Sequence, residues 1–236
     1  MQSWFIYKGE RSIDHGIWVT RLPGVVRAAE RAERLTVPGR PGVLTLLEGD
    51  DVHDPYIKEC VITAKRDANL DRVLEWLTGS GEAVFSNEPD RAYEATIYGA
   101  VEFTNISNSL CQANVPFLVH PHKKAVPAEA KITKTLAADT EQSIYNPGDV
   151  ASRPKIKITK SSSGNMTFKV ADVAMSFTSA PTVLVIDCDA HIVLKSDGQV
   201  WTGVYSGDFW KIPPGECEIE CNKACTVEIE PRWRWK

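Results

Sequence analysis

The second half of this 236-residue sequence consists of short runs of strand-forming residues separated by turn-forming residues. No helical pattern of apolar residues survives between the runs. Short strands at such regular spacing are typical of an antiparallel sandwich. The turn signals are Asn146-Pro147-Gly148, Ser162-Ser163-Gly164-Asn165, Ser196-Asp197-Gly198 and Pro213-Pro214-Gly215.

The first half also predicts strands, with a single packed helix among them. The helix is expected over residues 69–78, where Asn69 can form the N-cap and Gly79 the stop. Trp76 lies one position off the apolar stripe and is therefore a candidate contact with a neighbouring chain. The stripe itself is formed by Leu70, Val73, Leu74 and Leu77.

Two proline-rich stretches divide the chain. Residues 26–34 read as weak helix or exposed strand, and they run into the stiff loop 37–42, which no helix survives. Arg40 in this loop is a second candidate contact. The stretch 121–127 is the best linker, so we expect two domains, 1–125 and 126–236. The predicted fold class is mainly β: an N-terminal β domain with one packed α-helix, and a C-terminal antiparallel β-sandwich.

Charge and hydropathy exclude several classes of protein. The 27 Lys and Arg residues against 31 Asp and Glu give a net charge of -4, which argues against a nucleic-acid-binding surface. No apolar run approaches the ~18 residues of a membrane-spanning helix, and no signal-peptide pattern is present. We therefore expect synthesis in the cytosol, with the cysteines as thiols. The six are Cys60, Cys111, Cys188, Cys217, Cys221 and Cys225.

Two groups of residues could in principle ligate a metal. Cys217, Cys221 and Cys225 have a spacing that matches no usual zinc or iron–sulfur motif. Alternation on two strands would instead point all three thiols into a core, without metal. The run Asp187, Asp189 and His191 would share one face of a strand, which favours a solvated face over a cation site.

Nothing in the sequence predicts an active site or a cofactor. The nucleophile elbow, the P-loop and the dinucleotide-binding glycine motif are all absent. His120 and His122 flank Pro121 and read as a polar connection. The expectation is that the protein is not an enzyme and holds neither cofactor nor metal.

The seven tryptophans are a surplus that calls for explanation. In a terminal strand Trp233 and Trp235 share a face, with the basic residues of the 232–236 segment on the other. Such a ladder either closes the sandwich or forms an interface, in which Trp and Arg are enriched. Both alternatives remain open from sequence.

Several of these segments, in this order, resemble one known family. They are Phe5, Tyr7, Gly16 and Ile17, the 37–42 loop, the helix end 76–81, the stretch 84–89 with Tyr93, Pro116-Phe117, Asn146-Pro147-Gly148, Ser152-Arg153-Pro154, residues 183–187, residues 209–215 and the 232–235 ending. Together they resemble the distal tail protein family of long-tailed siphophages across nearly the whole chain. One departure is Phe209-Trp210, where the family usually has Phe-Pro.

The resemblance implies a structural phage tail protein. Domain 1–125 would form a homohexameric hub ring, and domain 126–236, galectin-like, would point outward as a docking arm. The implied location is the virion tail tip, after assembly in the host cytoplasm. The implied partners are the major tail tube protein, a tail-associated lysin or tail-tip hub protein, and receptor-binding or baseplate proteins.

Two further expectations depend on this resemblance. DNA would pass through the ring, so the lumen should be neutral or acidic. The acidic loop 48–54 is a candidate lumen-facing or tube-facing element, and the alternative is that it is only a solvated hairpin end. The alternative function is a carbohydrate-binding module that contacts cell-wall glycans. Trp201 could stack on a sugar ring, although His191 to Lys195 lacks the Asn and Arg that grip sugar hydroxyls in galectins.

Overall fold

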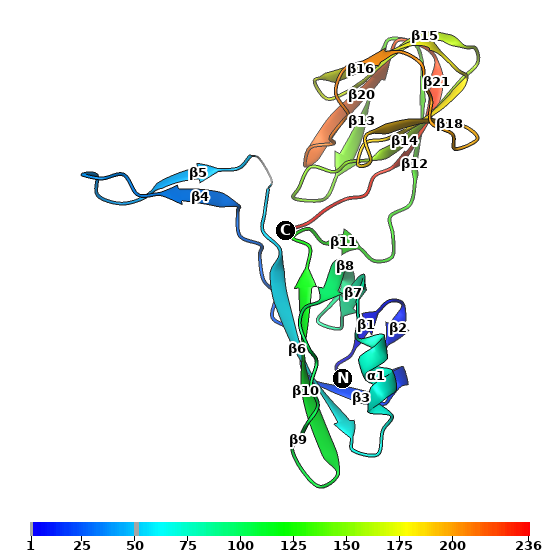
Figure 1. Ribbon diagram of the computed structural model, residues 1–236. Helices are drawn as coiled ribbons and strands as arrows, with labels where there is room; N and C mark the ends of the chain where they lie inside the picture. Colours follow the sequence, from blue (N-terminus) through cyan, green and yellow to red (C-terminus); the bar gives the residue numbers. More distant parts are fainter. Residues whose placement is uncertain (1, 50–51) are drawn as a thin grey trace. The chain divides into compact units, whose positions relative to one another are not determined.

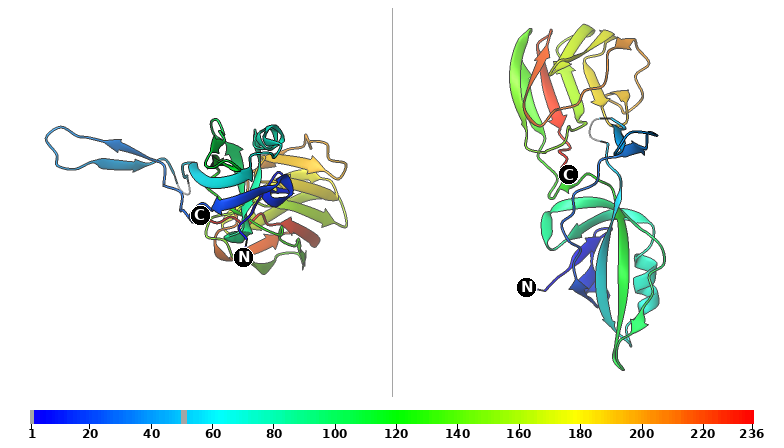
Figure 2. Two further views of the ribbon diagram at one scale, coloured as in Figure 1. Left: turned by 90° about the horizontal axis from the view of Figure 1, so that it is seen from below. Right: turned by 90° about the vertical axis from the view of Figure 1, so that its left-hand side faces the viewer.

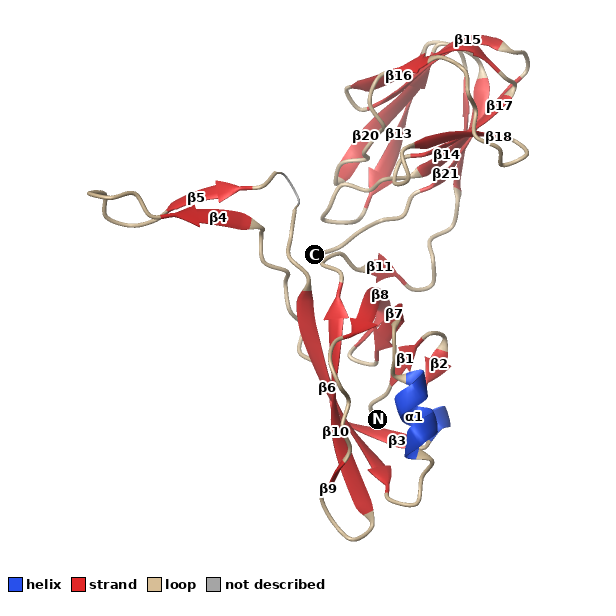
Figure 3. Ribbon diagram, viewed as in Figure 1, coloured by secondary structure: helices blue, strands red, loops and turns tan. Residues whose placement is uncertain are grey.

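The computed structural model describes residues 2–49 and 52–236. The chain divides into two compact units, a first that ends at Val126 and a second of Pro127–Trp235. Each unit is described on its own below. Figure 3 shows strands throughout both units and a single α-helix, so the predicted mainly β fold class is confirmed.

The first unit is built on a nine-stranded sheet in which every pair of neighbours is antiparallel. The main path runs β2-β1-β7-β8-β10-β6-β3, while β9 pairs with β10 and β11 with β8 (Figure 1). The strands are β1 Phe5–Tyr7, β2 Glu10–Arg11, β3 Ile17–Arg21, β6 Tyr56–Lys65, β7 Ser80–Phe85, β8 Glu88–Ile97, β9 Thr104–Asn105, β10 Leu110–Val119 and β11 Lys124–Ala125.

Alternation along the strands builds the core of the first unit. In β10 the side chains of Cys111, Ala113, Val115, Phe117 and Val119 are buried, while the residues between them are more exposed. Other strands add aromatic rings that pack on Phe117 edge to face at 5.4–5.5 Å between ring centroids. These rings are Phe5, Tyr7 and Phe85.

The predicted helix is present as α1, Leu70–Trp76. The side chain of Asn69 accepts a hydrogen bond from Arg72 N at 3.2 Å, as the N-cap prediction requires. The helix ends at Trp76, slightly earlier than expected, and Gly79 follows with a positive φ of 62°. This seven-residue helix is far too short to cross a membrane, and the described residues hold no helix that could.

The second unit is an antiparallel sandwich of two five-stranded sheets, as predicted. One sheet has the order β12-β21-β14-β17-β18 and the other β13-β20-β15-β16-β19. Inward-facing residues of both sheets form one core, which includes Trp210 and Trp233. The strands are β12 Ile132–Leu136, β13 Thr140–Asn146, β14 Lys155–Lys160, β15 Gly164–Val170, β16 Val173–Ala180, β17 Val183–Asp187, β18 Ile192–Lys195, β19 Tyr205–Ser206, β20 Gly215–Cys221 and β21 Cys225–Glu230.

Two strands of the first unit lie outside its large sheet. β4 (Ala32–Leu35) and β5 (Leu44–Leu47) form a separate two-stranded ribbon. The ambiguous stretch 26–34 therefore ends in an exposed strand, and the helical alternative is wrong. In Figures 1 and 2 this hairpin extends away from the sheet of its unit.

Candidate functional site

We call residues 32–47 the arm. The described residues show no other strand paired with β4 or β5. An isolated two-stranded hairpin is only marginally stable in water. This one also leaves large apolar side chains 39–60% exposed, which is unfavourable unless another surface covers them. The exposed apolar residues of the arm are Leu35, Val37, Val43, Leu44, Leu46 and Leu47.

The arm has one markedly apolar face. Residues opposite each other in the ribbon are Leu35 with Leu44, and Glu33 with Leu46. Directly paired residues share a face and alternate with the next pair, so Leu35, Leu44 and Leu46 lie on one face together with Glu33. Leu47 lies on the opposite face with the more polar residues. A strip of this kind suits contact with a second apolar surface.

The tip of the arm is stiff and exposed. Arg40 N donates to Val37 O at 3.2 Å, and Gly39 between them has a φ of 81°. Pro38 followed by a residue with positive φ matches a type II turn, which requires glycine at the second position. Arg40 is thus exposed at the tip, where the sequence placed a candidate contact; its role in binding stays a prediction.

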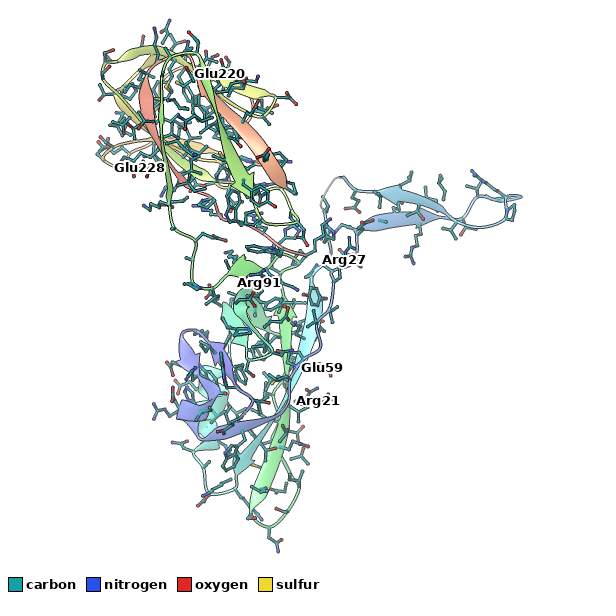
Figure 4. All side chains as sticks on the ribbon, turned by 180° about the vertical axis from the view of Figure 1, so that it is seen from behind. Arg21, Arg27, Glu59, Arg91, Glu220 and Glu228 are labelled. Carbon is teal, nitrogen blue, oxygen red and sulfur yellow. The ribbon has the colours of Figure 1, made fainter. Side chains whose placement is uncertain are left out.

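Residues 23–31, which we call the root of the arm, are fixed to the sheet by hydrogen bonds. The backbone pairs with the chain before β6: Arg31 N donates to Val52 O at 2.9 Å, and Asp54 N to Ala29 O at 2.9 Å. Arg27, labelled in Figure 4, lies in this root and is exposed. Three side chains, two from β6 and one from the turn between β7 and β8, also hold carbonyls of the root. Tyr56 OH donates to Val26 O at 3.3 Å, Lys58 Nζ to Gly24 O at 3.1 Å and Asn87 Nδ2 to Pro23 O at 2.9 Å.

A buried ionic cluster stands behind this anchor. Glu88 accepts from Lys58 Nζ at 2.9 Å, from Tyr93 OH at 2.6 Å and from Lys123 Nζ at 3.1 Å. Burial alone would raise the pKa of Glu88, but these three donors outweigh it and lower the pKa. Burial lowers the pKa of Lys58, and Glu88 opposes that shift. The Glu88 carboxylate therefore pairs with both Lys58 and Lys123, and Lys58 also donates a hydrogen bond to the arm root.

The acidic loop 48–54 is only partly described, because Asp50 and Asp51 lie outside the described residues. Asp54 forms an ion pair with Arg31 at 2.7 Å, and Glu48 lies 4.0 Å from the same guanidinium. Both of these carboxylates thus face a cation at the arm root. Their place in a lumen stays a prediction.

Trp76 is a core residue, and the expectation that it faces outward is wrong. Its side chain is 8% exposed, its ring stacks on Phe5 and on His15 at centroid distances of 5.5 and 4.0 Å, and Nε1 donates to Tyr7 O at 3.1 Å. The buried face of the helix consists of Val73, Trp76 and Leu77, which is rotated from the stripe that the leucines indicated.

The C-terminal tryptophans close the sandwich. Trp233 is buried in the core of the second unit, so its ring is not exposed for contact with another protein. Trp235 is half-buried against the same core. The arginines that alternate with them bind acidic residues: Arg232 forms a bidentate pair with Asp187 at 2.9 and 3.0 Å, and Arg234 binds Asp189 at 2.8 Å. An interface role for Trp235 stays a prediction.

The predicted face of Asp187, Asp189 and His191 does not form. Strand β17 ends at Asp187, whose Oδ1 accepts from the backbone N–H of Asp189 and of Ala190 at 3.1 and 3.2 Å. Burial would raise the pKa of Asp187, but Arg232 and these N–H groups lower it. His191 is turned away with a positive φ and lies against Phe209, 5.1 Å between centroids.

The three clustered cysteines of the second unit point into its core, as the alternation of residues predicts. Cys217, Cys221 and Cys225 are buried among the apolar residues of β20 and β21. Within the described part of the chain, no group of three or more His, Cys, Asp or Glu residues is arranged to hold a metal ion. All six cysteines are free thiols.

The remaining candidates fall into two groups. His120 and His122 lie in the proposed linker, and the His122 ring contacts that of His53 at 5.4 Å, which places this stretch against the arm root. Trp201 is 9% exposed and packs on Phe177 and Tyr205. This burial leaves the sugar-binding alternative without its stacking ring.

Sequence comparison identifies no relative: no protein-family model and no curated protein matches the chain. Among solved structures, the chain is similar to the SPP1 Dit (gp 19.1) protein, described as a paradigm of the hub adsorption apparatus in phages that infect Gram-positive bacteria. The TM-score is 0.79, with 14% identity, and the match covers 97% of this chain and 98% of that chain. The likeness shows a shared fold over both units.

Proposed function

We propose that the protein is a structural component of a phage tail hub, in which the first unit forms a homohexameric ring. The shared fold with a hub protein over almost the full length supports this class of function. The observation that carries the proposal is the arm: an anchored hairpin whose leucine face stays exposed among the described residues.

A ring explains this surface. In a closed ring each copy offers the same two patches, so the arm of one copy contacts a different surface of the next, and the contact repeats until the ring closes. The root anchors fix where each arm starts, and the stiff tip limits its conformations. Burial of the leucine face then contributes a gross hydrophobic term of about 25 cal/mol per Å² of apolar surface. The entropy lost on association opposes this term.

The second unit serves in this proposal as the outward docking domain. The partners would be the major tail tube protein, a tail-associated lysin or tip hub protein, and receptor-binding or baseplate proteins. The site of action would be the virion tail tip, with DNA passing through the ring, and no enzymatic activity is proposed.

Two-dimensional class averages of the purified full-length chain test the ring. We expect closed particles with a central opening and six-fold symmetry. Single copies only, or open filaments in place of closed particles, would contradict the proposal.

A further inference from the structure

One end of the sandwich in the second unit carries an open polar cavity. Two connections meet there, residues 161–163 between β14 and β15, and residues 222–224 between β20 and β21. Asn222 ties the second connection to β15, because its N–H donates to Thr167 O at 3.1 Å and its Oδ1 accepts from Thr167 N at 2.9 Å. The cavity has a volume of about 390 Å³ and is lined by Lys160, Ser161, Ser162, Ser163, Gly164, Asn165, Asn222, Lys223 and Ala224.

Lys160 is the unusual member of this lining. It follows Ile156 and Ile158 on the core-facing side of β14 and is only 7% exposed. Its Nζ donates to Gly164 O at 2.9 Å and to Ala180 O at 3.2 Å. Among the described residues no carboxylate forms an ion pair with it. A buried ammonium is costly without a counter-charge, so this position favours an anion.

The residues that line the cavity also provide no negative charge to balance Lys160. Lys223 is the other ionisable residue of the lining, and no carboxylate is present. Burial lowers the pKa of Lys160, the thiols of Cys221 and Cys225 oppose this shift, and the charge of Lys223 lowers the pKa further. A ligand with negative charge would relieve the repulsion between the two ammonium groups.

The neutral groups of the lining are mostly oriented as donors. Asn165 Oδ1 accepts from Ser179 N at 2.9 Å, and Asn222 Oδ1 is held by Thr167 N in the same way. Because each oxygen is engaged by a backbone N–H, each amide nitrogen remains to donate. Three consecutive serine hydroxyls complete a set of donors that matches a tetrahedral oxyanion.

We propose that this cavity binds a phosphate group, with Lys160 and Lys223 as its cationic ligands and the amides of Asn165 and Asn222 as neutral donors. The site is independent of the arm and of ring assembly, so it can fail without affecting the proposed function. Free phosphate and a phosphodiester share this chemistry, and the experiment below separates them.

The rival explanation is an internal counter-charge. The pKa of Cys221 is lowered to about 7, chiefly through its contact with Cys225 and also by Lys160, so a thiolate at Cys221 could neutralise the lysine. In that case an added anion would have no place at Lys160. The Cys221→Ser variant separates the two, because it removes the thiolate and keeps the lysine.

Amide chemical shifts of the full-length chain report binding directly. We expect inorganic phosphate and dimethyl phosphate to shift residues 161–165 and 222–224 saturably at constant ionic strength, while chloride does not. A response to both ligands indicates a diester-tolerant site, and a response to phosphate alone indicates a site for the free ion or a monoester. Equal shifts with chloride, or shifts spread over the surface, would overturn the proposal.

Two variants complete the test. Lys160→Met removes the charge from a core-facing position and is expected to weaken phosphate binding at least about tenfold, the effect of losing a charge-assisted bond. Lys169→Gln, outside the cavity, is the charge-matched control and should change the affinity by less than about twofold. Unchanged binding in Lys160→Met, or phosphate binding that appears only in Cys221→Ser and not in the wild-type chain, would refute the assignment. If Lys160→Met does not fold, Lys223→Gln at the exposed rim provides the same comparison.

Discussion

The indole of Trp76, the last residue of α1, stacks on Phe5 and on His15 and is part of the core of the first unit. The signal that could have placed it is the pair Val73 and Trp76, three residues apart, which with Leu77 defines one helical face. A seven-residue helix spans only about two turns, so its leucines alone do not determine which face is buried.

We predict that Trp76→Ala destabilises the first unit by about 3–5 kcal/mol, because it leaves a cavity and removes the bond to Tyr7 O. Denaturant unfolding of the full chain measures this, and Trp76→Phe should recover part of the loss. A Trp76→Ala chain with unchanged stability and impaired self-association would instead restore the interface role for this residue.

Glu88 offers a second prediction at this scale. Glu88→Gln leaves Lys58 and Lys123 buried without their counter-charge, and we expect a loss of about 3–5 kcal/mol in unfolding free energy. Since the folded pKa of Glu88 is lowered, its contribution is present above the unfolded pKa of about 4.3 and declines as the pH falls through the folded value.

The pH dependence supplies the control for Glu88. The stability difference between wild type and Glu88→Gln should shrink on acidification below about pH 4, where the unfolded carboxyl protonates. The exposed pair Arg21–Glu59, labelled in Figure 4, is a matched comparison at 3.8 Å, and Glu59→Gln should cost less than about 1 kcal/mol. Equal losses in the two variants would show that burial of the cluster contributes nothing.

At the scale of elements, the arm exposes large apolar side chains that the described residues do not cover. Leu44→Glu combined with Leu46→Glu places charge on the leucine face, and both positions are exposed, so folding should be retained. We predict that self-association weakens at least about tenfold, as for removal of an interface anchor.

Thr45→Glu provides a control within the same strand, since it adds a single charge on the opposite face. Sedimentation velocity over a concentration series measures both variants. If Thr45→Glu impairs association as strongly as the double substitution, the leucine face is not the contact surface.

Sequence patterns predicted most elements but missed how some of them end or pair. The sandwich strands and the Asn69 cap were foreseeable, because alternation and capping are local. Strand β5 was missed, although Leu44–Leu47 after the proline-glycine loop is a hairpin signal. The turn after Asp187 was missed because an Asx turn and alternation on a strand share the same acidic spacing. Pairing of distant residues, such as Lys58 with Glu88, leaves no periodic trace.

For the whole molecule, charge bears on passage of DNA. In the proposed hub, chains of net charge -4 would form a ring of negative net charge, in which an attractive bore would require segregation of the basic residues. We predict no tight binding of duplex DNA to the assembled protein at about 0.15 M salt. Fluorescence anisotropy across a salt series checks this, and salt-sensitive binding at that ionic strength would contradict the charge argument.

The central claim is that the arm and the first unit build a ring, and native mass spectrometry of the purified full-length chain tests it most directly. The account predicts a dominant species of six times the 26.2-kDa chain mass, which is lost in the Leu44→Glu/Leu46→Glu variant. A wild-type chain that remains a monomer at every concentration, or a hexamer that the double substitution leaves intact, would contradict it.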